Sequence, residues 1–185
     1  MKMNNYVVID IETSGLDEEN DEIIRLSALK IKNGEISEKF SSFCKPKKPL
    51  LKEMEILTGI TNADLNEKPQ IIDLLPDFLT FIGNETIVSH NVGFDLKFIN
   101  AALEKANMPP IKNETVDIYV LAKEKCELES YALYSIAEAL EISGRDGSYP
   151  EVSFRVYEKL KNIPDGEKVY KHDNDFKRRN YKKVD

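Results

Sequence analysis

The chain has 185 residues, which suits one domain of ordinary size and leaves too little for a second core of that kind. It is 41% hydrophobic and 32% charged, without the run of roughly 20 apolar residues that a membrane helix needs or the apolar core of a signal peptide. We therefore expect a soluble, cytoplasmic protein with no membrane partner. Cys44 and Cys126 form no disulfide framework or metal-ligand spacing, so we expect two reduced thiols.

The net charge of -7 argues against a general basic surface for nucleic-acid binding. It does not exclude a nucleic-acid enzyme, because carboxylates that hold divalent cations present positive charge to phosphate once the metal is bound. Five acidic residues lie within 17–22 and five basic residues within 177–183. Runs of this kind are typical of solvated loops and tails.

The hydrophobic pattern predicts a mixed sheet flanked by helices. Residues 6–11 suit a strand buried on both faces, and we expect this strand to be central. A hairpin over 22–32 and 35–43, turning at Asn33-Gly34, completes an antiparallel meander. The remaining expected elements are helices over 51–58, 71–82, 94–106, 131–140 and 152–160, and strands over 86–89 and 115–120. We expect one domain over 1–163 and a charged C-terminal tail over 164–185.

Two acids at the end of the first strand are candidate metal ligands. Asp10 and Glu12 are two residues apart, so their side chains project from the same face of a strand. Two adjacent acids at the end of an apolar strand are costly unless a cation or a proton neutralises them. The alternative is that the strand ends at Asp10 and both acids are solvated.

The residues that follow strengthen the metal hypothesis. The segment Thr13-Ser14-Gly15 supplies hydroxyls and a flexible turn where a phosphodiester could enter. A third acid, Asp95, opens the helix after the strand at 86–89. An Asp in a first helical turn also has an ordinary explanation, since it interacts favourably with the helix dipole.

Residues 8–16, Val-Ile-Asp-Ile-Glu-Thr-Ser-Gly-Leu, resemble the first motif of the DEDD superfamily of 3′-5′ exonucleases, of the DEDDh type. This group includes the proofreading epsilon subunit of bacterial DNA polymerase III and the exonuclease domain of Gram-positive replicative polymerases. Residues 89–95 resemble the second motif, 57–61 a segment near the bound nucleotide, and 131–140 the helix before the third motif. The resemblance covers roughly residues 5–160 and implies an α/β, ribonuclease H-like, mixed five-stranded sheet flanked by helices.

The resemblance also implies a function and a site. Asp10 and Glu12 would bind the catalytic metal and Asp95 the second, as Mg²⁺ or Mn²⁺, with two ions in a fully active enzyme. The reaction would release nucleoside 5′-monophosphates from the 3′ ends of single-stranded DNA or RNA, and a DNA polymerase is a further candidate partner. Candidate substrate contacts are Thr13, Leu16, Thr58 and Phe94.

The third motif departs from the family pattern. The family has a His that activates water and, five residues later, a metal-binding Asp; alignment on the last helix places Gly144 and Tyr149 there. Glycine cannot accept a proton, and tyrosine with a pKa near 10 is a poor Mg²⁺ ligand at neutral pH. The family's tyrosine subclass does not apply, because its Tyr stands four residues before the Asp and that distance from Tyr149 leads to Ser153.

Four other residues are considered as replacements. His90 precedes Asp95 by five residues, but its surroundings match the second motif, which favours a structural role. His172 could fold back from the tail, and Asp146 or Glu151 could lend a carboxylate. Two hypotheses therefore stand: a metal-dependent 3′-5′ exonuclease with an altered third motif, and a catalytically impaired exonuclease fold that binds nucleic-acid ends or a protein partner.

Overall fold

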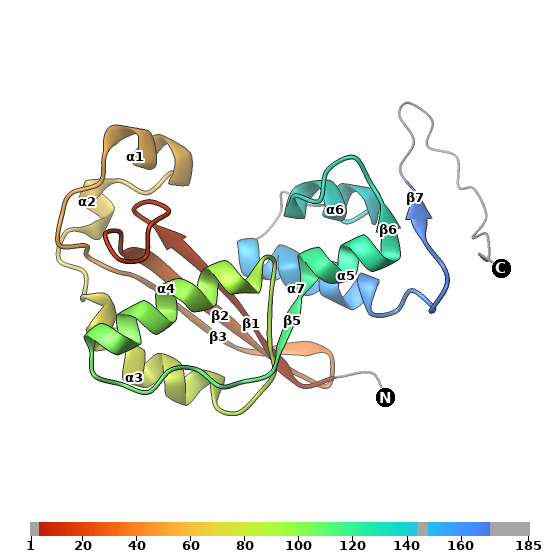
Figure 1. The fold of residues 1–185 in the computed structure, drawn as a ribbon, viewed down its shortest axis with the longest axis horizontal. Coiled ribbons are helices and arrows are strands. Elements are labelled where there is room, and N and C mark those ends of the chain that lie inside the picture. The colour runs from red at the N-terminus through yellow and green to blue at the C-terminus, as the bar shows by residue number, and fades with distance from the viewer. Residues whose placement is uncertain (1–3, 144–147, 171–185) are drawn as a thin grey trace.

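The computed structural model describes residues 4–143 and 148–170. Its main sheet has five strands in the order β3-β2-β1-β4-β5 (Figure 1). β1 pairs antiparallel with β2 and parallel with β4, and β4 pairs parallel with β5. The strands are β1 (Tyr6–Thr13), β2 (Ile23–Lys32), β3 (Glu35–Phe43), β4 (Ile87–Ser89) and β5 (Thr115–Asp117). The expected mixed five-stranded sheet, opening antiparallel meander and central first strand are confirmed.

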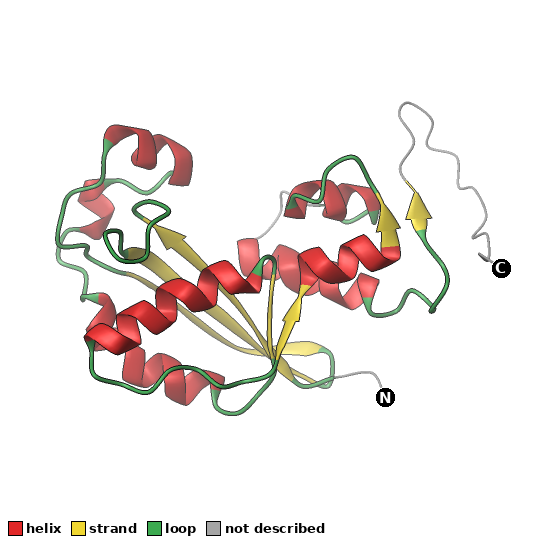
Figure 2. Cartoon of the chain, viewed as in Figure 1, coloured by secondary structure: helices red, strands yellow, loops and turns green. Residues whose placement is uncertain are grey.

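β1 is central because its apolar side chains are buried on both faces of the sheet. Val7, Ile9 and Ile11 belong to a core cluster with residues of α3 (Ile71–Ile82) and α4 (Val92–Lys105). Tyr6 and Val8 belong to the cluster on the opposite face, with residues of α5 (Ile118–Lys125), α6 (Leu133–Ala139) and α7 (Tyr149–Leu160). Helices therefore cover both faces of the sheet (Figure 2).

The segment between β3 and α3 forms a separate small lobe. It contains α1 (Lys52–Thr58) and α2 (Asn62–Leu65), which lie near the tip of the β1–β2 loop (Figure 1, upper left). Buried Leu50, Ile60 and Leu65 pack with Ile24 of β2 in a third cluster. The lobe is thereby attached to the end of the sheet at which β1 finishes.

Three local predictions need correction. The strand expected over 115–120 ends at Asp117, and α5 begins at once, because the Asp117 carboxylate accepts the backbone N–H of Tyr119 (2.8 Å) and caps the helix. α7 begins at Tyr149 and not at Val152, since Ser148 and Glu151 form a capping box. The sequence pattern also missed α2, β6 (Cys126–Glu127) and β7 (Val169–Tyr170).

The expected tail over 164–185 is only partly described. Within it β7 pairs with β6 in a two-stranded parallel sheet, and residues 171–185 lie outside the described residues. The domain division at residue 163 therefore stays a prediction. Cys44 and Cys126 are buried free thiols, as expected. None of the helices formed by the described residues is long and apolar enough to cross a membrane.

Candidate active site

Asp10 and Glu12 lie near the end of β1, on the face that α7 covers. They alternate with Ile9 and Ile11, whose side chains enter the opposite core cluster. Both acids are half-buried. The register with β2 shifts between Glu12 and Thr13, so the regular strand ends just beyond the two acids. The two carboxylates therefore lie on one face of β1, as the alternation of a strand predicts.

Asp95 reaches the same place from α4, where it lies in the first helical turn. Its side chain is only 4% exposed. Oδ1 accepts the backbone N–H of Ile11 (3.1 Å), and Oδ2 accepts the hydroxyl of Ser89 at the end of β4 (2.7 Å). The first bond ties the start of α4 to the middle of the Asp10–Glu12 segment, and the second ties it to the end of β4. The structure thus brings together all three predicted carboxylates.

Burial dominates the electrostatics of the three acids, and repulsion from the other two acts on Asp10. Burial, then the nearby charges of Asp95 and Glu12, raise the pKa of Asp10 well above its usual value. Burial also raises the pKa of Glu12, while the Arg25 guanidinium lowers it. Burial raises the pKa of Asp95 to about 7, although the hydrogen bonds from Ser89 and Ile11 favour its charged form. Without a cation, the cluster holds protons more tightly than isolated acids do.

The donor set suits a hard divalent cation only in part. Carboxylate oxygens are the ligands that Mg²⁺ and Mn²⁺ prefer, and a cation would relieve the repulsion between Asp10 and its neighbours. In the part of the chain that the structure describes, however, no three or more His, Cys, Asp or Glu residues are grouped so that they could hold a metal ion. Mg²⁺ is often held by one or two carboxylates together with substrate phosphates. The residues present fit that kind of site.

Tyr149 completes the surroundings of the two strand acids. It is the first residue of α7, is 38% exposed, and packs edge to face against Tyr134 of α6, with ring centroids 5.2 Å apart. Its pKa is raised by burial, by Tyr134, and by the negative charges of Asp10 and Glu12. Tyr149 therefore lies near enough to the two carboxylates for their charges to act on its hydroxyl. Gly144 lies outside the described residues.

Two of the four residues considered as replacements for the third motif, His90 and Glu151, are described by the structure, and both have other partners. The Nε2 atom of His90 lies 2.8 Å from the backbone oxygen of Tyr131, which suits the expected structural role. The Glu151 carboxylate forms an ion pair with Lys39 and caps its own helix. Asp146 and His172 lie outside the described residues.

The predicted substrate contacts on β1 and α4 differ in their availability. Thr13 is buried, and its hydroxyl donates to the backbone oxygen of Gly15 (2.6 Å). Leu16 is 82% exposed at the start of the following loop. Phe94 is half-buried, and its ring packs against Phe98, with centroids 5.0 Å apart. Leu16 is the candidate contact with the most surface available to a ligand.

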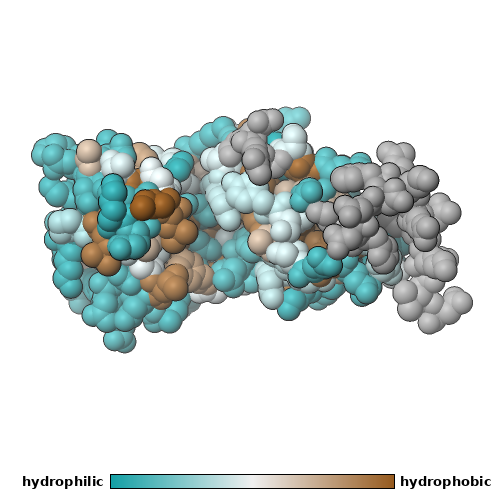
Figure 3. Space-filling model, turned by 90° about the horizontal axis from the view of Figure 1, so that it is seen from above, coloured by the Kyte–Doolittle hydropathy of each residue, from teal (hydrophilic) through white to brown (hydrophobic). Residues whose placement is uncertain are grey.

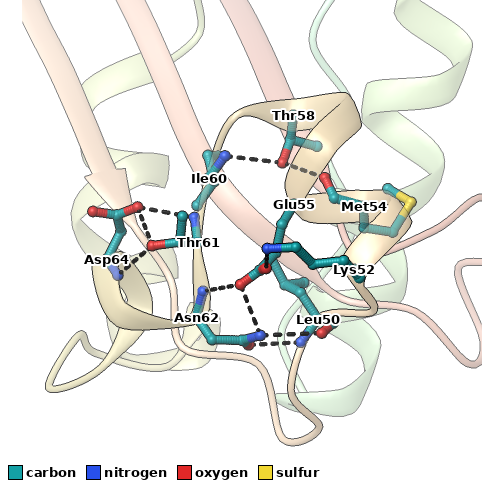
Figure 4. A network of polar contacts seen from close by, with 9 residues as sticks. All are labelled: Leu50, Lys52, Met54, Glu55, Thr58, Ile60, Thr61, Asn62 and Asp64. Atoms are coloured by element: carbon teal, nitrogen blue, oxygen red, sulfur yellow. Dashed lines mark hydrogen bonds and ion pairs between the residues drawn. The ribbon is translucent and has the colours of Figure 1, made fainter.

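Thr58 takes part in a local network that shapes the α1–α2 lobe (Figure 4). Its hydroxyl donates to the backbone oxygen of Met54 (2.8 Å) and accepts the backbone N–H of Ile60 (3.2 Å). Nearby, Glu55 accepts the backbone N–H of Asn62 (2.8 Å) and pairs with Lys52. The Thr58 hydroxyl therefore has a structural task at the end of α1, whether or not it contacts a ligand.

An apolar surface accompanies this lobe. Leu16, Leu51, Ile56 and Leu57 are all largely exposed, with Leu57 at 77%. Figure 3, viewed from above, shows hydrophobic residues at the surface of the half of the molecule that carries α1 and the end of β1. Exposed apolar side chains are suited to contacts with nucleobases.

Sequence reasoning missed three residues that shape the site. Ser89 lies within the second motif, but the motif does not indicate that its hydroxyl anchors Asp95. Arg25 stands opposite Glu12 in the β1–β2 register, which a correct alignment of the two predicted strands would have indicated. Tyr134 lies on α6, and nothing in its local pattern distinguishes it from an ordinary exposed aromatic residue.

A family model and a curated relative match most of this domain. The exonuclease family model RNase_T matches residues 7–146. The DNA polymerase III PolC-type protein of Oceanobacillus iheyensis is 39% identical over 140 residues, which are 75% of this chain and 10% of that protein. The chain thus spans about a tenth of the length of the curated relatives that it matches.

Solved structures share the fold. A product-bound exonuclease I has a TM-score of 0.75 at 17% identity, with 88% of this chain and 44% of that chain covered. Exonuclease X in complex with 5′ overhanging duplex DNA has a TM-score of 0.62 at 20% identity, with 85% of this chain and 98% of that chain covered. The predicted ribonuclease H-like fold is confirmed, and with the family match over residues 7–146 the chain belongs to the exonuclease family.

Proposed function

We propose that this chain is a metal-dependent 3′-5′ exonuclease that releases nucleoside 5′-monophosphates from nucleic-acid ends. The observation that carries the proposal is the convergence of Asp10, Glu12 and Asp95, with Ile11 N–H bonded to Asp95. Buried acids that repel one another reduce stability unless they serve a ligand, and perturbed carboxylates of this kind mark functional sites. Membership of the exonuclease family supports the same reaction.

In this proposal the three acids have separate roles. Asp10 and Glu12 would hold a Mg²⁺ or Mn²⁺ ion against the scissile phosphate, and Asp95 would contribute to a second ion. Bound ions would stabilise the charge that develops on the attacking and leaving oxygens. Asp95 also has a positioning role, because its bond to Ile11 N–H fixes the segment that carries the other two.

The proposed substrate is a single-stranded DNA or RNA 3′ end. Leu16 and Leu57 are highly exposed near the end of β1, where they could pack against nucleobases, and Phe94 would extend this contact. Thr13 and Thr58 remain proposed contacts with the substrate. Because the PolC-type relatives are DNA polymerase III proteins, action together with a DNA polymerase is part of the proposal. A location in the cytoplasm is also part of it.

A second function is favoured by one specific observation. Tyr149 lies near Asp10 and Glu12, at the position where the family motif has a further acid, and a phenol adds no negative charge at neutral pH. A fold with this site could bind strand ends or a protein partner without turnover. Loss of a general base alone costs typically 10²- to 10⁴-fold in rate, so slow turnover and no turnover need a sensitive assay to be separated.

The test measures mononucleotide release from 3′-labelled single-stranded DNA and RNA with Mg²⁺ or Mn²⁺. The intact chain is compared with Asp10→Asn/Glu12→Gln, which keeps the size of both side chains. Release that needs the metal and is lost in the variant supports the exonuclease. Binding of the labelled strand without release by the intact chain would support the second function.

A further inference from the structure

Tyr149 lies on the face of α7 that packs against the sheet. The buried residues Val152, Ser153, Val156 and Tyr157 follow it at intervals of three, four, seven and eight, which is the spacing of one helical face. Unlike them, Tyr149 is 38% exposed, because the apolar part of β1 has ended beneath it. Its side chain therefore extends the buried stripe of α7 into the carboxylate site.

A contact between two tyrosine rings fixes the level of Tyr149 along β1. Tyr6, the first residue of β1, packs edge to face against Tyr157, with ring centroids 5.0 Å apart. Tyr149 precedes Tyr157 by eight residues, about 12 Å along a helix. Asp10 follows Tyr6 by four residues, about 13 Å along a strand. With α7 antiparallel to β1, these displacements bring Tyr149 level with Asp10.

A contact with the neighbouring strand supports this direction. Glu151 forms an ion pair with Lys39 of β3, which pairs through Leu29 of β2 with Val8 of β1. Going back along α7 from Tyr157 to Glu151 thus corresponds to going forward along β1 from its first residue to Val8. The N-terminus of α7 consequently lies over the end of β1 that carries the acids (Figure 1).

The position of Tyr149 is held by its neighbours. Ser148 and Glu151 cap the helix, and the Tyr134 ring supports the Tyr149 ring at 5.2 Å. Among the hydrogen bonds of the described residues, none joins Tyr149 to Asp10 or Glu12, although their charges influence its hydroxyl. The phenol is a neutral donor that lies near two carboxylates and is partly exposed to solvent.

We propose that Tyr149 makes divalent-ion binding by Asp10 and Glu12 depend on a bound phosphate, because its hydroxyl donates a hydrogen bond to the phosphate and contributes no charge to the ion. Among the described residues no set of three acids is arranged to hold the ion alone. The phosphate of a nucleotide would supply the missing anionic oxygens. This inference rests on the proposed function, since it assigns the ion and the phosphate to the same site.

The experiment titrates the full chain with Mn²⁺ and follows the electron paramagnetic resonance signal of free Mn²⁺. Titrations are run alone, with thymidine 5′-monophosphate, and with thymidine, which lacks the phosphate. We expect the monophosphate to tighten Mn²⁺ binding by about tenfold or more, and thymidine to leave it unchanged. The titration of Asp10→Asn/Glu12→Gln with the monophosphate corrects for Mn²⁺ held by the nucleotide itself.

Two variants of Tyr149 test the role of the hydroxyl. Tyr149→Phe keeps the ring and should lose most of the gain from the monophosphate, since hydrogen bonds to charged groups are worth about tenfold or more in affinity. Tyr149→Asp should bind Mn²⁺ about tenfold more tightly without any nucleotide. Asp is favourable in a first helical turn, so this variant should fold. Tyr170→Phe, at an exposed tyrosine of β7 with no part in the site, is the control and should behave as the unaltered chain.

The inference and the proposed function can fail separately. Mn²⁺ binding at Asp10 and Glu12 that is equal with and without the monophosphate would overturn the inference and leave the exonuclease proposal standing. A gain that survives in Tyr149→Phe would also overturn it. Mn²⁺ binding that is coupled to the monophosphate, without mononucleotide release in the separate assay, would support the inference and contradict the exonuclease proposal. Mn²⁺ binding that is the same in Asp10→Asn/Glu12→Gln would overturn both.

Discussion

The backbone N–H of Ile11 donates a hydrogen bond to Oδ1 of Asp95 at 3.1 Å, although the two residues are 84 positions apart in the chain. Ile11 lies between Asp10 and Glu12, so this bond joins the helix that carries one acid to the strand that carries the other two. Because Asp95 is held by Ser89 as well, its carboxylate cannot turn away without leaving two donors unpaired. The geometry of the site is therefore built into the fold.

Asp95 should make the stability of the metal-free protein depend on pH. Its folded pKa of about 7 lies above the unfolded value near 3.9, so the folded state binds a proton between these values that the unfolded state releases. The free energy of unfolding should therefore fall as pH rises from about 4 to about 7, and this contribution should level off above that. Urea denaturation in the presence of a chelator measures this change.

Asp95→Asn isolates the contribution of this acid. The amide can still accept the Ile11 N–H and donate to Ser89, but it does not ionise. We expect the free energy of unfolding of the variant to exceed that of the unaltered chain by about 1 to 4 kcal/mol at pH 8. At pH 5 the difference should be much smaller. A difference between the two proteins that is the same at both pH values would contradict the assignment.

Removal of the Ser89 hydroxyl should raise the pKa of Asp95 further and destabilise the fold at pH 8. Ser89→Ala leaves a buried carboxylate oxygen without its donor, at a cost of about 1 to 3 kcal/mol. Ser27→Ala is a matched control, because Ser27 is a buried strand serine whose hydroxyl pairs with the neutral Ser41 (3.1 Å). Chemical denaturation of both variants should give the larger loss for Ser89→Ala, and equal losses would count against the charge-assisted bond.

Leu16→Ala should weaken substrate binding without a loss of stability. The side chain is 82% exposed, so its truncation should change the free energy of unfolding by less than about 0.5 kcal/mol. Loss of a contact with a nucleobase should raise KM or Kd for a single strand by about fivefold or more. Val120→Ala, at a half-exposed apolar position on α5, is the control. Unchanged strand affinity in Leu16→Ala would remove Leu16 from the substrate surface.

Gly15 and Asp21 should be energetically coupled. A Cβ on Gly15 would lie 2.2 Å from Oδ2 of Asp21, whose carboxylate accepts the backbone N–H of Asp17 (3.0 Å) and the hydroxyl of Ser14 (3.4 Å). Gly15→Ala should therefore displace Asp21 from the loop and destabilise the protein. After Asp21→Ala the same change should cost little, giving a coupling energy of about 0.5 to 3 kcal/mol. Additive losses in the double-mutant cycle would contradict this.

Much of the fold could be predicted from local pattern. The apolar run at 6–11, the Asn33-Gly34 turn and the helical stripe of α3 each follow from periodicity or turn chemistry. The first residues of the helices were harder to predict, because a single capping side chain determines each of them. Asp117 caps α5, and Ser148 caps α7. The two-residue strands β6 and β7 depend on a tertiary pairing that no local pattern reveals.

The site could be predicted in part, for a similar reason. The alternation of β1 placed Asp10 and Glu12 on one face, and the family motif added Asp95. Nothing in the sequence indicated that Tyr149 begins its helix or that it lies near these acids, since both depend on the packing of α7 against β1. The sequence identified Tyr149 as a departure from the third motif, and the structure shows that it lies beside Tyr134 and near the two acids.

A single-turnover reaction with a 3′-labelled single strand and Mn²⁺ tests whether Asp10 and Glu12 carry exonuclease chemistry. We expect labelled nucleoside 5′-monophosphate from the 3′ end, and none from Asp10→Asn/Glu12→Gln at the same concentration of folded protein. Product of the same kind from both proteins, or none from either, would contradict the claim that these carboxylates carry an exonuclease reaction.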